Sequence, residues 1–215
     1  MEYLILDIET RPDPMLETDP VWWQRKRDTV EPDGRLKDPL KIAADIESKL
    51  QDQRDRMALS PVTGIVACIG LQWYELDTPR VFTVDELSRD GERRLLHEFS
   101  QFLSGDTLGI IGWNVREFDI PFLCGRAMIS GIGLRGLPMP RDWQRVVDLK
   151  RDFNFSDSLD SWQYVAGQGF KPQTGEELLK LSLLELAEHC KQDIDNTAAL
   201  ARRLEWAWMR KGGRE

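Results

Sequence analysis

Four acidic side chains stand in segments whose local patterns predict that each carboxylate is presented at a defined point of the fold: Asp7, Glu9, Asp119 and Asp193. Asp7 and Glu9 lie two residues apart in the apolar run 3–10, so on a β-strand both carboxylates point to the same face. Asp119 follows a second apolar run, and Asp193 lies in a segment with helical periodicity. Carboxylates that are brought together repel one another strongly unless cations lie between them. The sequence therefore predicts a site for divalent metal ions.

A histidine stands one helical turn before the last of these carboxylates. His189 and Asp193 occupy positions i and i+4 of the expected helix and share a face, so the imidazole can reach the site that Asp193 helps to form. An imidazole titrates nearer to neutral pH than a phenol, which suits a group that orients or deprotonates an attacking water. The alternative is a helix histidine that is only packed or solvent-facing. Asp195, two residues further round the helix, is expected to face away.

The other side chains that bind metals do not suggest zinc. His97 and His189 are the two histidines of the sequence, and neither forms a pair with a cysteine at zinc-finger spacing. Cys68, Cys124 and Cys190 are odd in number and widely spaced, which indicates reduced, partly buried thiols. Carboxylate oxygens favour hard cations, so the expected cofactor is Mg²⁺ or Mn²⁺.

The pattern of apolar residues predicts an α/β layered domain with a mixed sheet flanked by helices. Strands are expected at about 2–9, 64–73, 80–84, 107–113 and 145–149, and helices at about 91–103, 119–130, 158–165 and 182–209, with another starting near Thr174. The polar segment of about 11–60 contains two helix-like pieces, one around Trp22 and Trp23 and one at about 38–57. We interpret it as an insertion after the first strand of a single domain that spans 1–215.

Composition and charge limit the classes of function. The chain has 215 residues, 41% of them hydrophobic and 31% charged, and no apolar stretch approaches the length of ~20 residues that spans a bilayer. The segment 1–3 has no basic residue before the first strand, so a cytoplasmic protein is expected. A net charge of −8 argues against a non-specific duplex binder, but a nuclease needs only a local basic rim. Candidates for such a rim are Arg116, Arg126, Arg135, Arg141, Arg145, Lys150 and Arg151.

Three segments, in this order, resemble the exonuclease motifs of the DEDD superfamily: Asp7-Ile8-Glu9-Thr10, Asn114-Val115-Arg116-Glu117-Phe118-Asp119 and His189-Cys190-Lys191-Gln192-Asp193. The resemblance is closest to the predicted 3′–5′ exonucleases similar to the proofreading domain of family B DNA polymerases, and it runs over nearly the whole chain. It implies a ribonuclease H-like fold, two bound divalent ions and removal of nucleotides from a 3′ end of single-stranded nucleic acid.

The resemblance also implies a role for each acidic residue and for the histidine. Asp7 would bridge both ions, Glu9 and Asp193 would bind the ion that activates water, and Asp119 would hold the other ion through bound water. His189 would act on the attacking water. It stands where the tyrosine subclass has tyrosine in Tyr-x-x-x-Asp, whereas the histidine subclass places its imidazole five residues before the aspartate, so the subclass stays open.

Substrate contacts are implied for three further residues. Asn114 and Phe118 match positions that touch the 3′-terminal nucleotides by hydrogen bonding and by stacking or wedging, although Phe118 could equally be a core residue. Thr10 would offer its backbone N–H to the terminal sugar or phosphate. Trp22 and Trp23 could form a lid or a surface that guides the strand, anchor the insertion to the body, or mediate self-association.

Two other functions remain open at this stage. The altered third motif is compatible with a catalytically silent nucleic-acid-binding relative, and the expected fold is also that of ribonuclease H-like endonucleases. DNA is favoured over RNA only because of the polymerase-like resemblance. The sequence contains no polymerase module, so a polymerase or repair partner would act in trans, and the oligomeric state is open.

Overall fold

The structure is a computed structural model of the chain, and it describes all residues except 1, 77, 104–107, 166–174 and 213–215. In the described part of the chain, five strands form one sheet in the order β3-β2-β1-β4-β5. They are β1 (Tyr3–Pro12), β2 (Gly64–Trp73), β3 (Arg80–Thr83), β4 (Gly109–Gly112) and β5 (Val146–Asp148). β1 pairs antiparallel with β2 and parallel with β4, and β4 pairs parallel with β5, so the sheet is mixed as predicted.

Helices flank this sheet and form most of the remaining structure. They are α1 (Pro14–Glu17), α2 (Pro20–Thr29), α3 (Pro39–Asp55), α4 (Arg89–Phe102), α5 (Asp119–Ser130), α6 (Leu149–Asp152), α7 (Leu159–Val165), α8 (Gly175–Leu178) and α9 (Leu183–Gly212), with short 3₁₀ turns η1 (Met57–Leu59) and η2 (Pro140–Arg145). None of the helices that the structure describes combines the length and the apolar character needed to cross a membrane.

The central strand β1 divides the core because its side chains alternate between two faces. Leu4, Leu6 and Ile8 are buried in one cluster together with apolar residues of α4 and α5. Ile5 is buried in a second cluster with Ile194 and other apolar residues of α9. By the alternation of a strand, the acidic residues at positions 7 and 9 share the α9 side with Ile5.

A glycine in β2 lets α9 lie close to this face of the sheet. Gly70 pairs with Asp7 in the antiparallel ladder. A Cβ atom at Gly70 would lie 2.7 Å from Cys190 Sγ and 2.8 Å from an Ile194 side-chain carbon, which is closer than real contacts allow. The absence of a side chain at this position therefore brings the helix with the third motif against the strand with the first.

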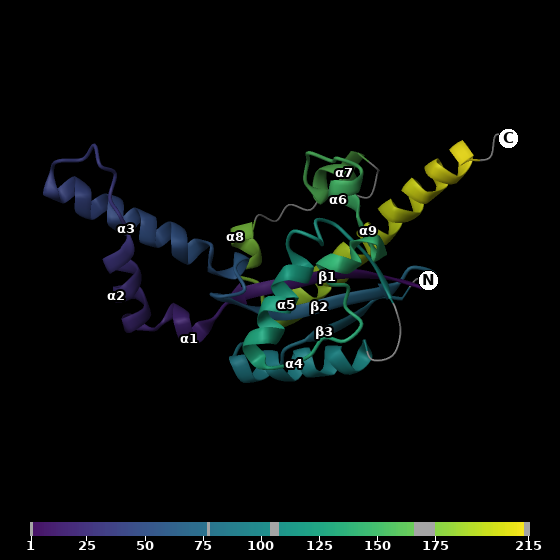
Figure 1. Cartoon of the computed structure of the whole chain (residues 1–215), viewed down its shortest axis with the longest axis horizontal. Coiled ribbons are helices and arrows are strands. Elements are labelled where there is room, and N and C mark those ends of the chain that lie inside the picture. Colours follow the sequence, from purple (N-terminus) through teal and green to yellow (C-terminus); the bar gives the residue numbers. More distant parts are fainter. Residues whose placement is uncertain (1, 77, 104–107, 166–174, 213–215) are drawn as a thin grey trace.

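The segment between β1 and β2 forms α1, α2, α3 and η1, and Figure 1 shows α2 and α3 projecting past the end of β1, away from the sheet. Three Asp-Pro pairs explain where its helices begin. Asp13, Asp19 and Asp38 each accept a hydrogen bond from a backbone N–H of the first turn, and each is followed by a proline at the first helical position. An acceptor at the cap and a proline at the next residue are favourable at helix starts.

The strand bounds differ from the predicted ones at two places. β1 continues to Pro12 rather than ending near residue 9, because a register shift after Glu9 lets the last residues keep pairing with β2. β4 begins at Gly109, and the residue expected to open it, Thr107, lies outside the described residues. The expected start of a helix near Thr174 also lies outside them, and α8 covers Gly175–Leu178.

Candidate active site

Two residues of β1 meet two consecutive turns of α9. His189 Nδ1 lies 2.7 Å from Glu9 Oε1 and 3.3 Å from Asp193 Oδ2. Cys190 Sγ lies 3.5 Å from Asp7 Oδ2, a distance that fits a weak S–H···O hydrogen bond. Both acidic residues of the first motif therefore face α9, from which His189 and Asp193 reach the same place.

The ligating atoms of three of these residues are close enough to hold a metal ion. One ligand atom each from Glu9, His189 and Asp193 lies within 4.8 Å of the others. The side chains are largely shielded from solvent, with 13% of Glu9 and 10% of His189 exposed. A shielded set of carboxylate oxygens with one imidazole suits a divalent cation.

Asp119 enters the same region from the other side of β1. It is the first residue of α5, only 4% exposed, and its Oδ1 accepts a hydrogen bond of 3.0 Å from the backbone N–H of Ile8, between the two acids of β1. The pKa of Asp119 is raised to about 7, first by burial and then by the charges of Glu9 and Asp148, against the hydrogen bonds that lower it. A carboxyl group in this setting resists ionisation until a cation approaches.

The pKa of Asp7 is raised by burial and by neighbouring negative charge, as is that of Asp119. It lies well above the usual range, first because of burial and then because of the negative charges of Glu9, Asp119 and Asp193. Among the described residues, no Lys or Arg forms an ion pair with Asp7, Glu9 or Asp119. No such ion pair therefore offsets the charge of these three side chains, and their oxygen ligands fit hard divalent ions.

One buried cation lies beside the cluster without joining it. Arg11 is 5% exposed, and its guanidinium donates hydrogen bonds to the carbonyl oxygens of Thr10 and Leu181. Burial lowers the pKa of Arg11, while the charge of Glu9 raises it. The side chain fastens the segment before α9 to β1, which helps to fix the position of the helix that carries His189.

The loop after β4 contains the second motif and is held by an acid that sequence reasoning did not single out. Asp148, fully buried at the end of β5, accepts hydrogen bonds from the backbone N–H groups of Asn114, Arg116 and Arg151 at 3.1, 3.0 and 3.2 Å. Asn114 has a φ of 61°, a left-handed conformation that is uncommon for residues other than glycine. An acid at the end of a parallel strand, next to the strand that carries the motif, was the available signal.

The three residues expected to touch substrate differ in their surroundings. Asn114 and Phe118 are half-buried, and the Phe118 ring packs against Phe122 with centroids 5.5 Å apart. Thr10 is buried, and its hydroxyl donates a 2.7 Å hydrogen bond to the carbonyl of Ala58 in η1. Thr10 therefore ties the end of β1 to the insertion, and its hydroxyl is engaged within the protein.

Several arginines proposed for a basic rim are structural instead. Arg126 is 1% exposed and forms a bidentate ion pair with the fully buried Glu92. Arg116 bonds Asp152 and two backbone carbonyl groups, and Arg145 bonds the carbonyl of Leu108. A buried charge must be paired and hydrogen-bonded. The partners of these arginines are distant in the sequence, so local residue patterns did not reveal the contacts.

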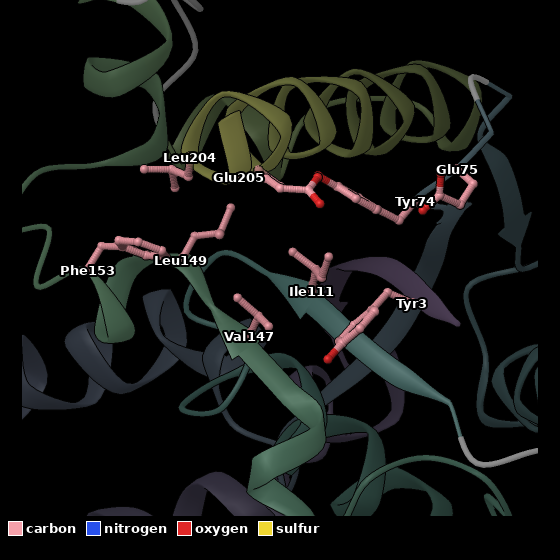
Figure 2. Close-up of a pocket in the computed structure, with 10 residues that line it drawn as sticks. Tyr3, Tyr74, Glu75, Ile111, Val147, Leu149, Phe153, Leu204 and Glu205 are labelled. Atoms are coloured by element: carbon pink, nitrogen blue, oxygen red, sulfur yellow. The ribbon is translucent and has the colours of Figure 1, made fainter. Parts of the chain in front are cut away.

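A cavity lies between the sheet and the C-terminal half of α9. It has a volume of about 350 Å³, and Figure 2 shows aromatic and aliphatic side chains lining it, among them Tyr3, Ile111, Val147 and Leu204. Tyr3 is the first residue of β1, whereas the acidic residues lie further along the strand. None of the four carboxylates lines this cavity, so it is separate from the candidate site.

Residues 58–163 match a family described as predicted 3′–5′ exonucleases related to the exonuclease domain of PolB. The matched residues include the second motif, with Asn114, Phe118 and Asp119, while the first and third motifs lie outside them. The resemblance predicted from the three motifs is confirmed. The match supports a hydrolytic nuclease.

Solved structures with the same fold include a DNA polymerase. The family B polymerase of the archaeon Pyrobaculum calidifontis has a TM-score of 0.57 and 17% identity, over 95% of this chain and 24% of the polymerase. E. coli exonuclease I in complex with a dT13 oligonucleotide has a TM-score of 0.44 and 12% identity, over 95% of this chain and 41% of that protein. The predicted ribonuclease H-like fold class is confirmed. No curated protein matches the chain.

Proposed function

We propose that this protein is a metal-dependent 3′–5′ exonuclease that hydrolyses phosphodiester bonds from the 3′ end of single-stranded nucleic acid. The observation that carries the proposal is the convergence of four carboxylates from three distant segments, Asp7, Glu9, Asp119 and Asp193, at one place between β1, α5 and α9. The family match gives the class of reaction. The geometry of this cluster supports it as the place of the reaction.

Two Mg²⁺ or Mn²⁺ ions are the cofactors that fit these ligands. Asp7, Glu9, Asp119 and Asp193 would hold them, and each of these side chains offers hard oxygen ligands. When bound, such ions neutralise charge on the phosphate, provide a nucleophile that is ionised near neutral pH, and stabilise the leaving oxygen. The raised pKa of Asp7 indicates that the metal-free cluster carries more negative charge than its surroundings stabilise.

The reaction is hydrolysis of the last phosphodiester bond. Water attacks the terminal phosphorus, and the bond from phosphorus to the 3′ oxygen of the preceding nucleotide breaks. The products are a nucleoside 5′-monophosphate and a strand one nucleotide shorter with a free 3′ hydroxyl. His189, 2.7 Å from Glu9, orients the water and accepts its proton, and the leaving oxygen takes a proton from solvent.

Asn114, Phe118 and Thr10 are proposed to position the terminal nucleotides. Asn114 and Phe118 flank the turn that leads into Asp119, so contacts with the sugar and base would align the scissile phosphate with the carboxylates. Stacking on Phe118 tolerates any base, as an exonuclease requires. DNA is favoured over RNA because of the likeness to PolB. A polymerase or repair partner in trans and a cytoplasmic location complete the proposal.

A nuclease assay distinguishes this function from its rivals. A 5′-labelled single-stranded DNA oligonucleotide is incubated with the purified protein in EDTA, Mg²⁺ or Mn²⁺, with Asp7→Ala as the inactive control. A ladder that shortens from the 3′ end only with metal supports the proposal. Binding without shortening supports a catalytically silent relative. Cuts in a circular single strand, which offers no end, support a ribonuclease H-like endonuclease.

A further inference from the structure

The insertion contains an aromatic and basic cavity that the proposed chemistry does not use. It has a volume of about 430 Å³ and lies between α2 and α3. Its lining includes Trp22, Trp23, Lys26, Asp52, Arg56 and Met57. α2 has no buried residue, so its two tryptophans do not serve the protein core.

The floor of this cavity is joined to the strand that carries the first motif. Met57 and Thr63 line the cavity, and Thr63 donates a 2.9 Å hydrogen bond to the carbonyl of Met57. The next residue of η1, Ala58, accepts the hydroxyl of Thr10, which directly follows Glu9. In Figure 1, α2 and α3 extend beyond this end of β1. A nucleic-acid strand that extends from the acidic cluster along β1 would therefore reach the cavity next.

A cation lies over each of the two indole rings. Lys26 Nζ lies 4.9 Å from the centroid of the Trp22 ring, and Arg54 Cζ lies 4.3 Å from that of Trp23. Trp23 Nε1 donates to the carbonyl of Glu17. Trp22 Nε1, by contrast, is buried and has no hydrogen-bond partner among the described residues. Buried donors are rarely left unsatisfied, so this nitrogen is an exception in the described part of the chain.

The charge of the cavity fits a polyanion. Lys26 and Arg56 face a single acid, Asp52, in a chain whose net charge is −8. Cations beside aromatic rings form the usual surface for single-stranded nucleic acid, in which phosphates meet the charges and bases stack on the rings. An apolar partner would not require the two cations. A cationic partner would be repelled by them.

We propose that this cavity binds the nucleotides on the 5′ side of the terminal pair, so that the single strand runs from the acidic cluster into the insertion. Bases stack on Trp22 and Trp23, and phosphates lie against Lys26 and Arg56. The inference rests on the proposed exonuclease function, because that function places the 3′ end at the carboxylates. The cavity binds a strand that is long enough to reach it from the acidic cluster. It adds no affinity for a mononucleotide, which occupies only the acidic cluster.

The test compares a long substrate with a minimal one. The long substrate is a (dT)12 oligonucleotide, and the minimal one is the p-nitrophenyl ester of thymidine 5′-monophosphate, which needs only the acidic cluster. Trp22→Ala and Trp23→Ala should each raise KM for the oligonucleotide by about fivefold or more, the value of one stacked base. Hydrolysis of the ester should stay unchanged, which also shows that the variants fold. Trp22→Phe should retain most of the affinity.

Charge variants give an independent measurement. Lys26→Gln and Arg56→Gln should each reduce the salt dependence of oligonucleotide binding, log Kd against log salt, by about 0.7. Lys41→Gln is the matched control, since Lys41 is an exposed cation of α3 that does not line the cavity. An equal effect of Lys41→Gln would overturn the assignment of the cavity.

The remaining outcomes separate the two proposals. Unchanged oligonucleotide KM in the tryptophan variants, with normal cleavage, overturns the strand path and leaves the exonuclease function standing. If the cavity variants weaken binding of (dT)12 but the unmodified protein hydrolyses neither substrate, the exonuclease proposal is wrong. The cavity then still binds single-stranded nucleic acid. If the tryptophan variants instead dissociate an oligomer in sedimentation without weakening oligonucleotide binding, the occupant is a second copy of the chain and the proposal is wrong.

Discussion

His189 Nδ1 lies 2.7 Å from Glu9 Oε1, although 180 positions separate the two residues in the sequence. The contact joins the helix of the third motif to the strand of the first. The same nitrogen is 3.3 Å from Asp193, so the imidazole lies between two carboxylates whose charges would otherwise repel. Either a metal cation or this imidazole can reduce the repulsion between the two carboxylates. Metal binding and the orientation of His189 should therefore depend on each other.

Replacement of His189 by phenylalanine tests its part in proton handling. The ring volume is nearly kept, but both nitrogens are lost, so we expect kcat to fall by about 10²- to 10⁴-fold while KM for the oligonucleotide changes little. His189→Tyr should retain appreciable activity with a pH optimum displaced upward, because a phenol gives up its proton at higher pH. Single-turnover rates across the pH range measure both effects. An unchanged profile in the tyrosine variant would show that the imidazole handles no proton.

Asp7→Asn tests the ligand that lies at the centre of the cluster. The side chain keeps its size and loses its charge, so metal-dependent cleavage should be abolished while the thermal unfolding transition is kept. Far-UV circular dichroism and oligonucleotide binding by anisotropy serve as controls. Glu188→Gln, on the exposed side of α9, is the matched change and should leave cleavage intact. Substantial cleavage by Asp7→Asn would remove Asp7 from the metal site.

The raised pKa values of two carboxyl groups predict how the stability of the metal-free protein depends on pH. Asp119 has a pKa of about 7 in the folded protein, and the pKa of Asp7 is also raised, whereas an unfolded aspartate has a pKa of about 3.9. Between these values the folded state binds more protons than the unfolded state. The contribution of these groups to the free energy of unfolding therefore decreases as pH rises from about 4 to about 7.

Urea unfolding in EDTA, measured across this pH range, checks the prediction. Asp119→Asn should flatten the decrease and should be more stable than the unmodified protein at pH 8, because the variant removes a charge that burial disfavours. Addition of Mg²⁺ should stabilise the unmodified protein at pH 8 and have a smaller effect on the variant. A metal-free stability that rises through this range equally in both proteins would contradict the assignment.

The sequence predicted helices and strands well where the residues that determine their bounds lie within or next to the element itself. The helix expected at 119–130 is α5, with the same bounds, since Gly131 takes the left-handed conformation that ends a helix. The bonding of Arg126 to Glu92 and to the carbonyl of Pro61 was not predictable, because its partners lie 34 and 65 positions away. Asp148 stands at the end of an expected strand, which was a signal, but its role was missed. Its partners are backbone N–H groups, which every residue type except proline offers.

The buried ion pair of Arg126 and Glu92 should matter for stability and not for nucleic-acid binding. The two side chains are 2% and 0% exposed, and Glu92 also accepts the backbone N–H of Val66. Removing one partner leaves an uncompensated buried charge, so Arg126→Met should cost about 3–5 kcal/mol in the free energy of unfolding. Urea denaturation measures this cost. The double variant Arg126→Met/Glu92→Leu should recover part of it, and Kd for (dT)12 should be the same in whatever variants remain folded.

Asp148→Asn tests whether the loop of the second motif is held by its buried acid. Asp148 accepts three backbone N–H groups, through Oδ1 from Asn114 and Arg151 and through Oδ2 from Arg116. In the variant, one oxygen becomes an NH₂ group that cannot accept, so at least one N–H loses its partner at a cost of about 1–3 kcal/mol. The strained φ of Asn114 is then less well supported, and the loop should shift away from Asp119. We expect a higher KM for oligonucleotides with a free 3′ hydroxyl and a smaller change in Kd for strands whose 3′ end is blocked. If stability falls with no change in KM, Asp148 supports the fold without positioning substrate.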